Sequence, residues 1–287
     1  MTDNGDVMGR IDLLDRQYAP PIPGLPVEVT TVAAIRGRRE GVMRRPGRVL
    51  FHMALICTGG EGLHEVDFTP VMLQPRRVVH VQPGQVHRWR FARDYAATVV
   101  MFSDATGTLR GPGWPVGPRW FDLEDDEWSC TNDVLHMIRR EMKLVRSVER
   151  RDRSLNGALQ MLIVNLGLDL PRHQDTATLP GPYVELLDQM EDDGWSRSAK
   201  ERARRLGYSQ RTLTRACLTA TGRTAKEVID DRVVLEAQRL LIDSNHSISA
   251  IASYLAFSES SNFSKFFRRS TGTAPTAWRD HHRTTDS

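Results

Sequence analysis

The hydrophobic positions divide the chain into a β-type segment followed by helical segments. From Val27 to about Ser103, short apolar or alternating runs such as VLFHMALIC and VVHVQPGQVHRWRF are separated by Gly and Pro. Period-two alternation bounded by turn residues predicts strands of an antiparallel barrel or sandwich. The Gly- and Pro-rich stretch TGTLRGPGWPVGP then predicts a loop that ends the β-type segment.

Residues 124–170 change to a helical period. In DDEWSCTNDVLHMIRREMKLVRSVER, apolar residues from Trp128 to Val145 recur at helical spacing and leave Arg139 and Arg140 on the other side. RSLNGALQMLIVNLGLDL is apolar around much of its circumference, so the helix it predicts needs burial on more than one side. Packing against the first helix and the β-type segment is one explanation. An interface between two protomers, made by the same helix pair, is the other.

A linker separates this part from the last region. PRHQDTATLPGP mixes Pro, Gly, Thr and polar residues, and everything after it has a helical pattern. The predicted organisation is an N-terminal arm over 1–26, a β-type domain over 27–123, a helical dimerisation segment over 124–170, a linker over 171–181 and an all-helical domain over 182–287.

The all-helical domain contains one helical pair twice. RLGYSQRTLTRACLTATG aligns with YLAFSESSNFSKFFRRSTG with one inserted residue, so that Leu206 matches Leu255 and Gly222 matches Gly272. In the first copy, Gly207 is placed to end a short helix and Ser209 to cap the next one. This is the helix-turn-helix arrangement, whose second helix enters a DNA major groove. A hairpin built only for stability is the alternative.

The segment between the two copies predicts a single helix. AKEVIDDRVVLEAQRLLIDS has one apolar stripe, and about 19 helical residues span about 28 Å. That length is close to one DNA turn of about 34 Å, so two recognition helices joined by it can lie in successive major grooves.

Charge is distributed unevenly. The formal net charge is only +3, yet from Trp195 to Arg283 there are 16 Lys and Arg against 8 Asp and Glu, an excess of +8. A polyanion is the expected partner of such a region. The 40% hydrophobic and 26% charged residues are those of an ordinary soluble protein, and neither a signal peptide nor a membrane span is recognised, so a cytoplasmic location is expected.

Cysteine usage predicts neither disulfides nor a zinc site. Cys57, Cys130 and Cys217 are odd in number and far apart. We interpret them as small buried hydrophobic residues.

The C-terminal motifs resemble those of a known family. AFSESSNFSKFFRRSTGTAPTAWR resembles the signature tail of the AraC/XylS family of bacterial transcription regulators, and RVVLEAQRLL is similar to its central motif. The resemblance covers residues 181–283 and implies a double helix-turn-helix DNA-binding domain. Ala256 stands where the family usually has a turn glycine and Cys217 where an aromatic residue is common. Both remain small or apolar, so the fold is expected to be retained.

The exposed positions of the two second helices are the candidate DNA contacts. Arg and Gln can form bidentate hydrogen bonds with base edges, and short hydroxyl side chains let a helix approach the duplex closely. The predicted DNA-binding residues are Gln210, Arg211, Thr214 and Arg215 in the first copy and Ser260, Ser261, Asn262, Ser264 and Lys265 in the second.

The β-type domain is similar to the cupin-like sensor barrel that precedes this DNA-binding domain in many family members. Pro83, Gly84 and His87 match the PxGxxH half of a cupin motif. The earlier hairpin offers only His64 and Glu65, without the HxH of cupin enzymes. We therefore predict no metal, no cofactor and no catalytic residue.

A small-molecule effector fits this domain better than a metal. His87, Trp89 and Phe91 share one face of a predicted strand, and an apolar interior with one or two imidazoles can form a ligand wall. The predicted effector-binding residues are His52, His64, His87 and Trp89. The alternative is a filled core in which the same histidines are hydrogen-bonded.

Together these features predict an α+β protein of two domains: an N-terminal cupin-like antiparallel β-barrel with following helices, and a C-terminal all-α double helix-turn-helix domain. The predicted function is a sequence-specific DNA-binding transcription regulator, not an enzyme, that acts as a homodimer. Its predicted partners are double-stranded operator DNA and a small-molecule effector, with RNA polymerase as a further candidate and no membrane. Two alternatives are a cupin-type metalloenzyme with a DNA-binding tail and an effector-free architectural DNA binder.

Overall fold

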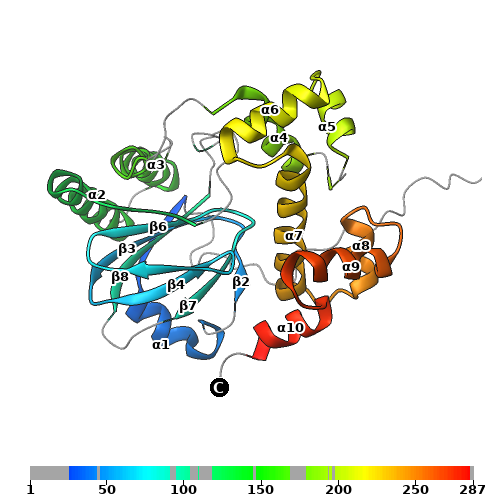
Figure 1. Cartoon of the computed structure of the whole chain (residues 1–287). Coiled ribbons are helices and arrows are strands. Elements are labelled where there is room, and N and C mark those ends of the chain that lie inside the picture. The colour runs from blue at the N-terminus through cyan, green and yellow to red at the C-terminus, as the bar shows by residue number, and fades with distance from the viewer. Residues whose placement is uncertain are drawn as a thin grey trace, which may run out of the picture. The chain divides into compact units, whose positions relative to one another are not determined.

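The chain forms two compact units that divide between Thr178 and Leu179 (Figure 1). The computed structural model describes residues 26–43, 46–90, 95–103, 109, 118–144, 147–168, 179–192, 194–195 and 198–284. The predicted N-terminal arm, except for its last residue, and most of the predicted linker lie outside the described residues. Each unit is described below by itself.

In its described residues, the N-terminal unit contains two antiparallel sheets and three helices. Its elements are β1 (Val27–Thr31), α1 (Val32–Met43), β2 (Gly47–Arg48), β3 (His52–Gly59), β4 (Gly62–Val66), β5 (Thr69–Leu73), β6 (Arg77–Val81), β7 (Val86–Arg90), β8 (Ala96–Phe102), β9 (Arg119–Asp122), α2 (Asp125–Lys143) and α3 (Val148–Asn165). One sheet has the strand order β1-β8-β3-β6-β9 and the other β2-β7-β4-β5. The predicted antiparallel fold of this region is confirmed.

The five-stranded sheet is buried on both faces, which explains its unbroken apolar strands. Along β3, Met53 and Leu55 belong to the inner cluster between the two sheets. Ala54 and Ile56 belong to the outer cluster, where α2 and α3 cover the sheet with residues such as Leu159. Alternation along one strand therefore supplies side chains to two separate cores.

Two elements differ from the predicted β-type segment. α1 follows β1 directly, because VAAIRGRREGVM is rich in helix-forming Ala, Arg and Glu, and its Val32 is buried in the inner cluster. β9 lies beyond the loop that was expected to end the strands, and pairs with β6 through partners such as Val78 and Phe121. The strands of the domain thus continue to Asp122.

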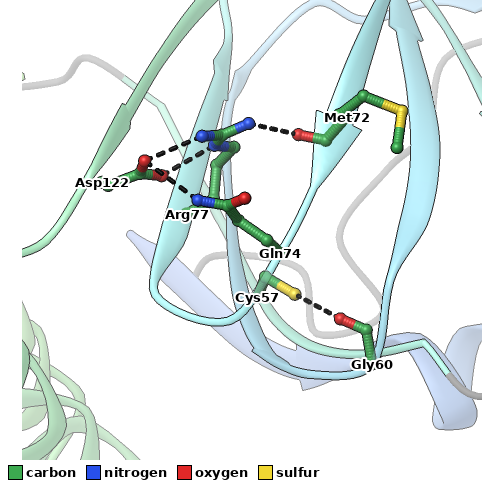
Figure 2. A network of polar contacts seen from close by, with 6 residues as sticks. All are labelled: Cys57, Gly60, Met72, Gln74, Arg77 and Asp122. Carbon is green, nitrogen blue, oxygen red and sulfur yellow. Dashed lines mark hydrogen bonds and ion pairs between the residues drawn. The ribbon is translucent and has the colours of Figure 1, made fainter.

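Arg77 connects edge strands of the two sheets (Figure 2). Its Nε and Nη2 donate to both carboxylate oxygens of Asp122 on β9 at 2.7 Å, and its Nη1 donates to the carbonyl of Met72 on β5 at 2.9 Å. Gln74 donates to the same carboxylate at 3.1 Å. The hydrogen bond from Arg77 lowers the pKa of Asp122. One guanidinium therefore holds β5 and β9 side by side without a backbone ladder between them.

The C-terminal unit is helical, as predicted. Its helices are α4 (Gly181–Asp192), α5 (Ala199–Arg205), α6 (Gln210–Thr221), α7 (Ala225–Asp243), α8 (Ile248–Tyr254), α9 (Ser260–Thr271) and α10 (Pro275–Thr284). The predicted connecting helix is α7, with 19 residues and a capping box in which Thr224 accepts from the Glu227 amide. Within the described residues of both units, no helix combines the length and apolarity that crossing a bilayer requires.

The turns of the two helix-turn-helix copies have the same backbone. In the first, the amide of Tyr208 donates to the carbonyl of Ala203 at 2.8 Å, and in the second Phe257 donates to Ala252 at 2.9 Å. Such a helix end needs a left-handed residue, which is Gly207 at φ 74° in the first copy. The second copy places Ala256 there at φ 59°.

Ala256→Gly is expected to raise the free energy of unfolding of the C-terminal unit by about 1 kcal/mol, because an L-residue with a Cβ is disfavoured in the left-handed region. The matched change Gly207→Ala should lower it by about the same amount, since a Cβ there meets no atom and only the backbone is strained. Denaturant unfolding of the two variants measures both effects. Equal stabilities for all three proteins would contradict the prediction.

An arginine holds the C-terminal end of α4 in the first copy. Arg202 on α5 has no exposed surface, and its Nη1 donates to the carbonyl of Gln189 at 3.1 Å. Its Nη2 donates to the carbonyl of Gly194, just beyond the helix. Because helix ends leave carbonyls without partners, this buried guanidinium stabilises both α4 and the approach of α5 to it.

An arginine from a different helix does the same for α7 in the second copy. The position equivalent to Arg202 is Ile251, which is fully buried and apolar. Arg279 on α10 instead donates to the carbonyl of Leu241 at 3.1 Å and to that of His246 at 2.7 Å. The second copy therefore depends on α10 for a contact that the first copy makes internally.

Cysteine burial differs from the prediction at one position. Cys57 and Cys217 are buried, as expected, but Cys130 is exposed. It lies on α2, whose buried side is formed by residues such as Val134 and Leu135. The helical period centres the buried side on Thr131, Val134, Leu135 and Ile138 and leaves position 130 at its edge.

Candidate nucleic-acid interface

The recognition helices α6 and α9 are equivalent in length, register and ending. Both have 12 residues and end at a left-handed glycine, Gly222 with φ 71° and Gly272 with φ 81°. Each buries its fourth, seventh and eighth residues: Leu213, Ala216 and Cys217 in α6, and Phe263, Phe266 and Phe267 in α9. The same outward positions are therefore available in both helices.

Each recognition helix packs against the connecting helix and its own copy. α6 contacts α4, α5 and α7, whereas α9 contacts α7, α8 and α10. Aromatic rings fix α9: the ring centroids of Phe257 and Phe263 are 5.4 Å apart, and those of Phe267 and Trp278 are 5.9 Å apart. Cys217 takes the place of Phe267 in α6 and is fully buried, so the first copy has the smaller core.

The predicted DNA-binding residues all lie on α6 and α9, on the side away from the core. Seven of them are exposed: Gln210, Arg211, Arg215, Ser260, Ser261, Asn262 and Lys265. Thr214 and Ser264 are half-buried, and the Ser264 hydroxyl donates to the carbonyl of Ser260 at 2.9 Å. Each set therefore lies on the part of one helix that the core leaves uncovered.

The cations on this face have no partner among the residues that the structure describes. In the described part of the chain, Arg211, Arg215 and Lys265 make neither an ion pair nor a side-chain hydrogen bond, and the same holds for Arg268 and Arg269 on α9. Several cations outside α6 and α9 are paired instead, as the following contacts illustrate. Arg205 binds Glu201 on α5, Arg223 binds Asp231, and Lys226 binds Asp230 on α7.

The sequence interpretation did not include Arg268 and Arg269. Arg268 lies seven residues after Ser261, so the helical period alone places Arg268 on the same side of α9 as Ser261. The other side chains on this face are short and polar. Unpaired positive charges among them are suited to bind the phosphates that flank a DNA groove.

Two equivalent helices with unpaired cations, held apart by a 19-residue helix, define a DNA-binding protein with a double helix-turn-helix domain. A helix-turn-helix domain family matches residues 202–281. The transcriptional activator RhaS of Yersinia pseudotuberculosis is 26% identical over 236 residues, covering 78% of this chain and 85% of that protein. The chain is a DNA-binding transcription regulator with a helix-turn-helix domain, and it is similar to regulators of the AraC family.

The chain is also similar to solved structures. The DNA-binding domain of AdpA in complex with a target DNA is 27% identical, with a TM-score of 0.34, and covers 37% of this chain and 97% of that one. ToxT from Vibrio cholerae is 12% identical, with a TM-score of 0.43, and covers 91% of this chain and 99% of that one.

Three of the four predicted effector residues lie together in the N-terminal unit. His64 on β4 pairs in register with Trp89 on β7, and their ring centroids are 4.8 Å apart. The His87 ring lies 5.3 Å from that of His64 and 5.5 Å from that of Trp89. Both nitrogens of His64 and Nδ1 of His87 are buried without a hydrogen-bond partner in the described chain. Phe91 lies outside the described residues.

His52 is not part of this group. It lies on the even-numbered side of β3, with Ala54, and so faces the outer cluster beneath α2 and α3. There it forms a 3.1 Å hydrogen bond with His80 and stacks on Phe102, with ring centroids 5.3 Å apart. His80 is the buried imidazole that the sequence interpretation missed, although Val78 and His80 share one face of β6 by simple alternation.

Burial keeps the imidazoles of His64, His80 and His87 uncharged. It lowers the pKa of His87 to about 4, and it lowers the pKa of His64 and His80 well below the usual range. Repulsion from His87 adds to the effect at His64, and repulsion from His52 and then Arg119 adds to it at His80. Neutral rings can each donate one hydrogen bond and accept another.

The N-terminal unit is therefore expected to lose stability in acid. A histidine whose pKa is depressed in the folded state takes up its proton mainly on unfolding, so stability falls as the pH drops below about 6.5 towards the folded value. With a folded pKa of about 4, His87 alone should cost about 2 kcal/mol between pH 7 and pH 5. Hydrogen exchange of the β3 and β6 amides measures the loss of stability in acid. His87→Gln should reduce that loss by about 2 kcal/mol. An unchanged loss in His87→Gln would contradict the assignment.

No metal centre is found in the described residues, where no group of three or more His, Cys, Asp or Glu side chains could hold an ion. Glu65, the other hairpin residue considered as a ligand, is engaged elsewhere. Its carboxylate accepts from Arg88 at 2.8 Å and from Arg90 at 3.0 Å. It lies on the opposite side of β4 from His64.

Proposed function

We propose that the protein regulates transcription by inserting α6 and α9 into successive major grooves of an operator. The observation that carries the proposal is the equivalence of the two helices, each with its apolar side buried and unpartnered cations outward. In this arrangement Arg211 and Arg215 read bases, whereas Lys265, as a flexible point charge, holds phosphate. An operator is bacterial chromosomal DNA, so the protein acts in the cytoplasm.

Selection of bound sequences from a random DNA pool tests this assignment. Arg211→Ala and Arg215→Ala should each alter the consensus at one position, because losing a bidentate contact with guanine costs about 1–3 kcal/mol of discrimination. Lys265→Ala should weaken binding equally at all sequences. Arg205→Ala, exposed but paired within α5, is the control and should change neither. An unaltered consensus in both arginine variants would show that these side chains contact the DNA phosphate backbone and not the bases.

We also propose that a small molecule binds beside His64, His87 and Trp89 and changes DNA binding. The unpaired imidazole nitrogens support this, because buried polar groups without partners cost about 1–3 kcal/mol each and a polar ligand group could satisfy them. Ligand and DNA must then affect each other's affinity by the same factor. Compounds that raise the melting temperature of the wild type but not of His87→Gln would identify the class. A ligand response retained in full by that variant would place the sensor elsewhere.

Dimerisation through α2 and α3 is the third part of the proposal. On α3, Met161 and Val164 are 53% and 59% exposed and lie one turn apart, and a Cβ on nearby Gly157 would meet open space. Close helix approach needs such a small residue beside apolar ones. Met161→Glu with Val164→Lys should convert a micromolar dimer to a monomer in sedimentation. A monomeric wild-type protein would contradict this proposal and show that α2 and α3 only pack within the N-terminal unit.

RNA polymerase is the protein partner that the class suggests. RhaS is named a transcriptional activator, and activation by an operator-bound regulator involves RNA polymerase.

A further inference from the structure

An apolar side chain interrupts the DNA-facing side of α6. Leu218 is 46% exposed, although the helix buries its apolar residues on the other side. Because α6 and α9 share one register, Leu218 occupies the position that Arg268 occupies in α9. The two copies therefore present different chemistry at the same point.

Leu218 belongs to the row of side chains that is placed to meet bases. Arg211, Thr214, Arg215 and Leu218 are spaced i, i+3, i+4 and i+7, the spacing with which the recognition helix of a homeodomain contacts bases along a major groove. Helical side chains lean towards the preceding turn, so Leu218 lies over Thr214 and Arg215. About half of the Leu218 side chain remains exposed, so it can contact a molecule that binds to this row of residues.

Leucine can recognise only one kind of group in the groove. It neither donates nor accepts a hydrogen bond, and phosphate contact would leave its apolar surface opposite a charge. Among the base edges of the major groove, the C5-methyl of thymine is the apolar feature.

We infer that Leu218 is a specificity-determining residue that contacts a thymine methyl beside the base pair met by Arg215. This inference rests on the proposed placement of α6 in the major groove. It makes the two half-sites chemically distinct, since the first copy requires a thymine at a position where the second copy, with Arg268, meets phosphate.

Deoxyuridine isolates the methyl contact, because it differs from thymidine only by that methyl group. The full-length protein is bound to its selected operator, and each thymine is replaced by deoxyuridine in turn. One replacement in the part contacted by α6 should weaken wild-type binding about fourfold, the effect of one buried methyl-sized group. Leu218→Ala should bind the thymine and deoxyuridine operators equally. Thr219→Ala, a change at the adjacent exposed position, should retain the fourfold difference.

The outcomes separate this inference from the proposed function. A wild type that selects no operator overturns both. Selective binding with no sensitive thymine, or a fourfold difference that persists in Leu218→Ala, overturns the role of Leu218 alone.

Discussion

Operator affinity of the full-length protein is expected to fall by about a thousandfold or more between 50 and 200 mM salt, the loss for a protein with six or more phosphate contacts. Each contact releases a condensed counterion, and the five unpartnered cations of α6 and α9 lie within a region of +8 excess charge. Fluorescence anisotropy with a labelled operator across a salt series measures the slope.

Charge-neutralising variants show which side chains contribute to that slope. Arg268→Gln and Arg269→Gln should each reduce it by about 0.9, the value for one phosphate contact in duplex DNA. Arg205→Gln provides the matched control, because that guanidinium is bound to Glu201 at 2.8 Å and lies on α5. Affinity that does not respond to salt would show that the unpaired cations do not face phosphate.

Arg202→Ala is expected to lower the free energy of unfolding of the C-terminal unit by about 3 kcal/mol, because buried carbonyls lose a charged donor and the side chain leaves a cavity. The partners of Arg202 are the carbonyls of Gln189 and Gly194, and the guanidinium has no exposed surface. Urea unfolding followed by helical circular dichroism measures the change.

Arg205→Ala is again the comparison, since it removes an exposed pair from the same helix. Such a pair contributes about 0.5 kcal/mol, so the two substitutions should differ severalfold. Arg202→Met, which keeps volume without the donors, should lie between them. Equal effects for Arg202→Ala and Arg205→Ala would show that burial of Arg202 adds nothing to stability.

The repeated recognition helices could be predicted because their signals are local. Gly222 and Gly272 end the helices by a backbone conformation that glycine adopts easily, and the apolar period fixes which side is buried. The outward set, including the overlooked Arg268, follows from that period.

Tertiary placement could not be read in the same way. His52 and His64 both lie on buried strands, yet they face different cores. The sequence could not separate them, because both faces of a fully buried strand are apolar. Arg202 stands in a basic run that suggests a solvated helix face. Its burial depends on carbonyls 13 and 8 residues earlier that meet it only in the folded unit.

The contact that α10 makes with α7 has a genetic consequence. Arg279, which donates to the carbonyls of Leu241 and His246, is encoded after both recognition helices, whereas its counterpart in the first copy, Arg202, is encoded before them. A frameshift or nonsense mutation between codons 274 and 279 would spare every candidate base-reading residue and still remove Arg279. Alleles truncated there should behave as defects of the second half-site, with the first half-site still occupied.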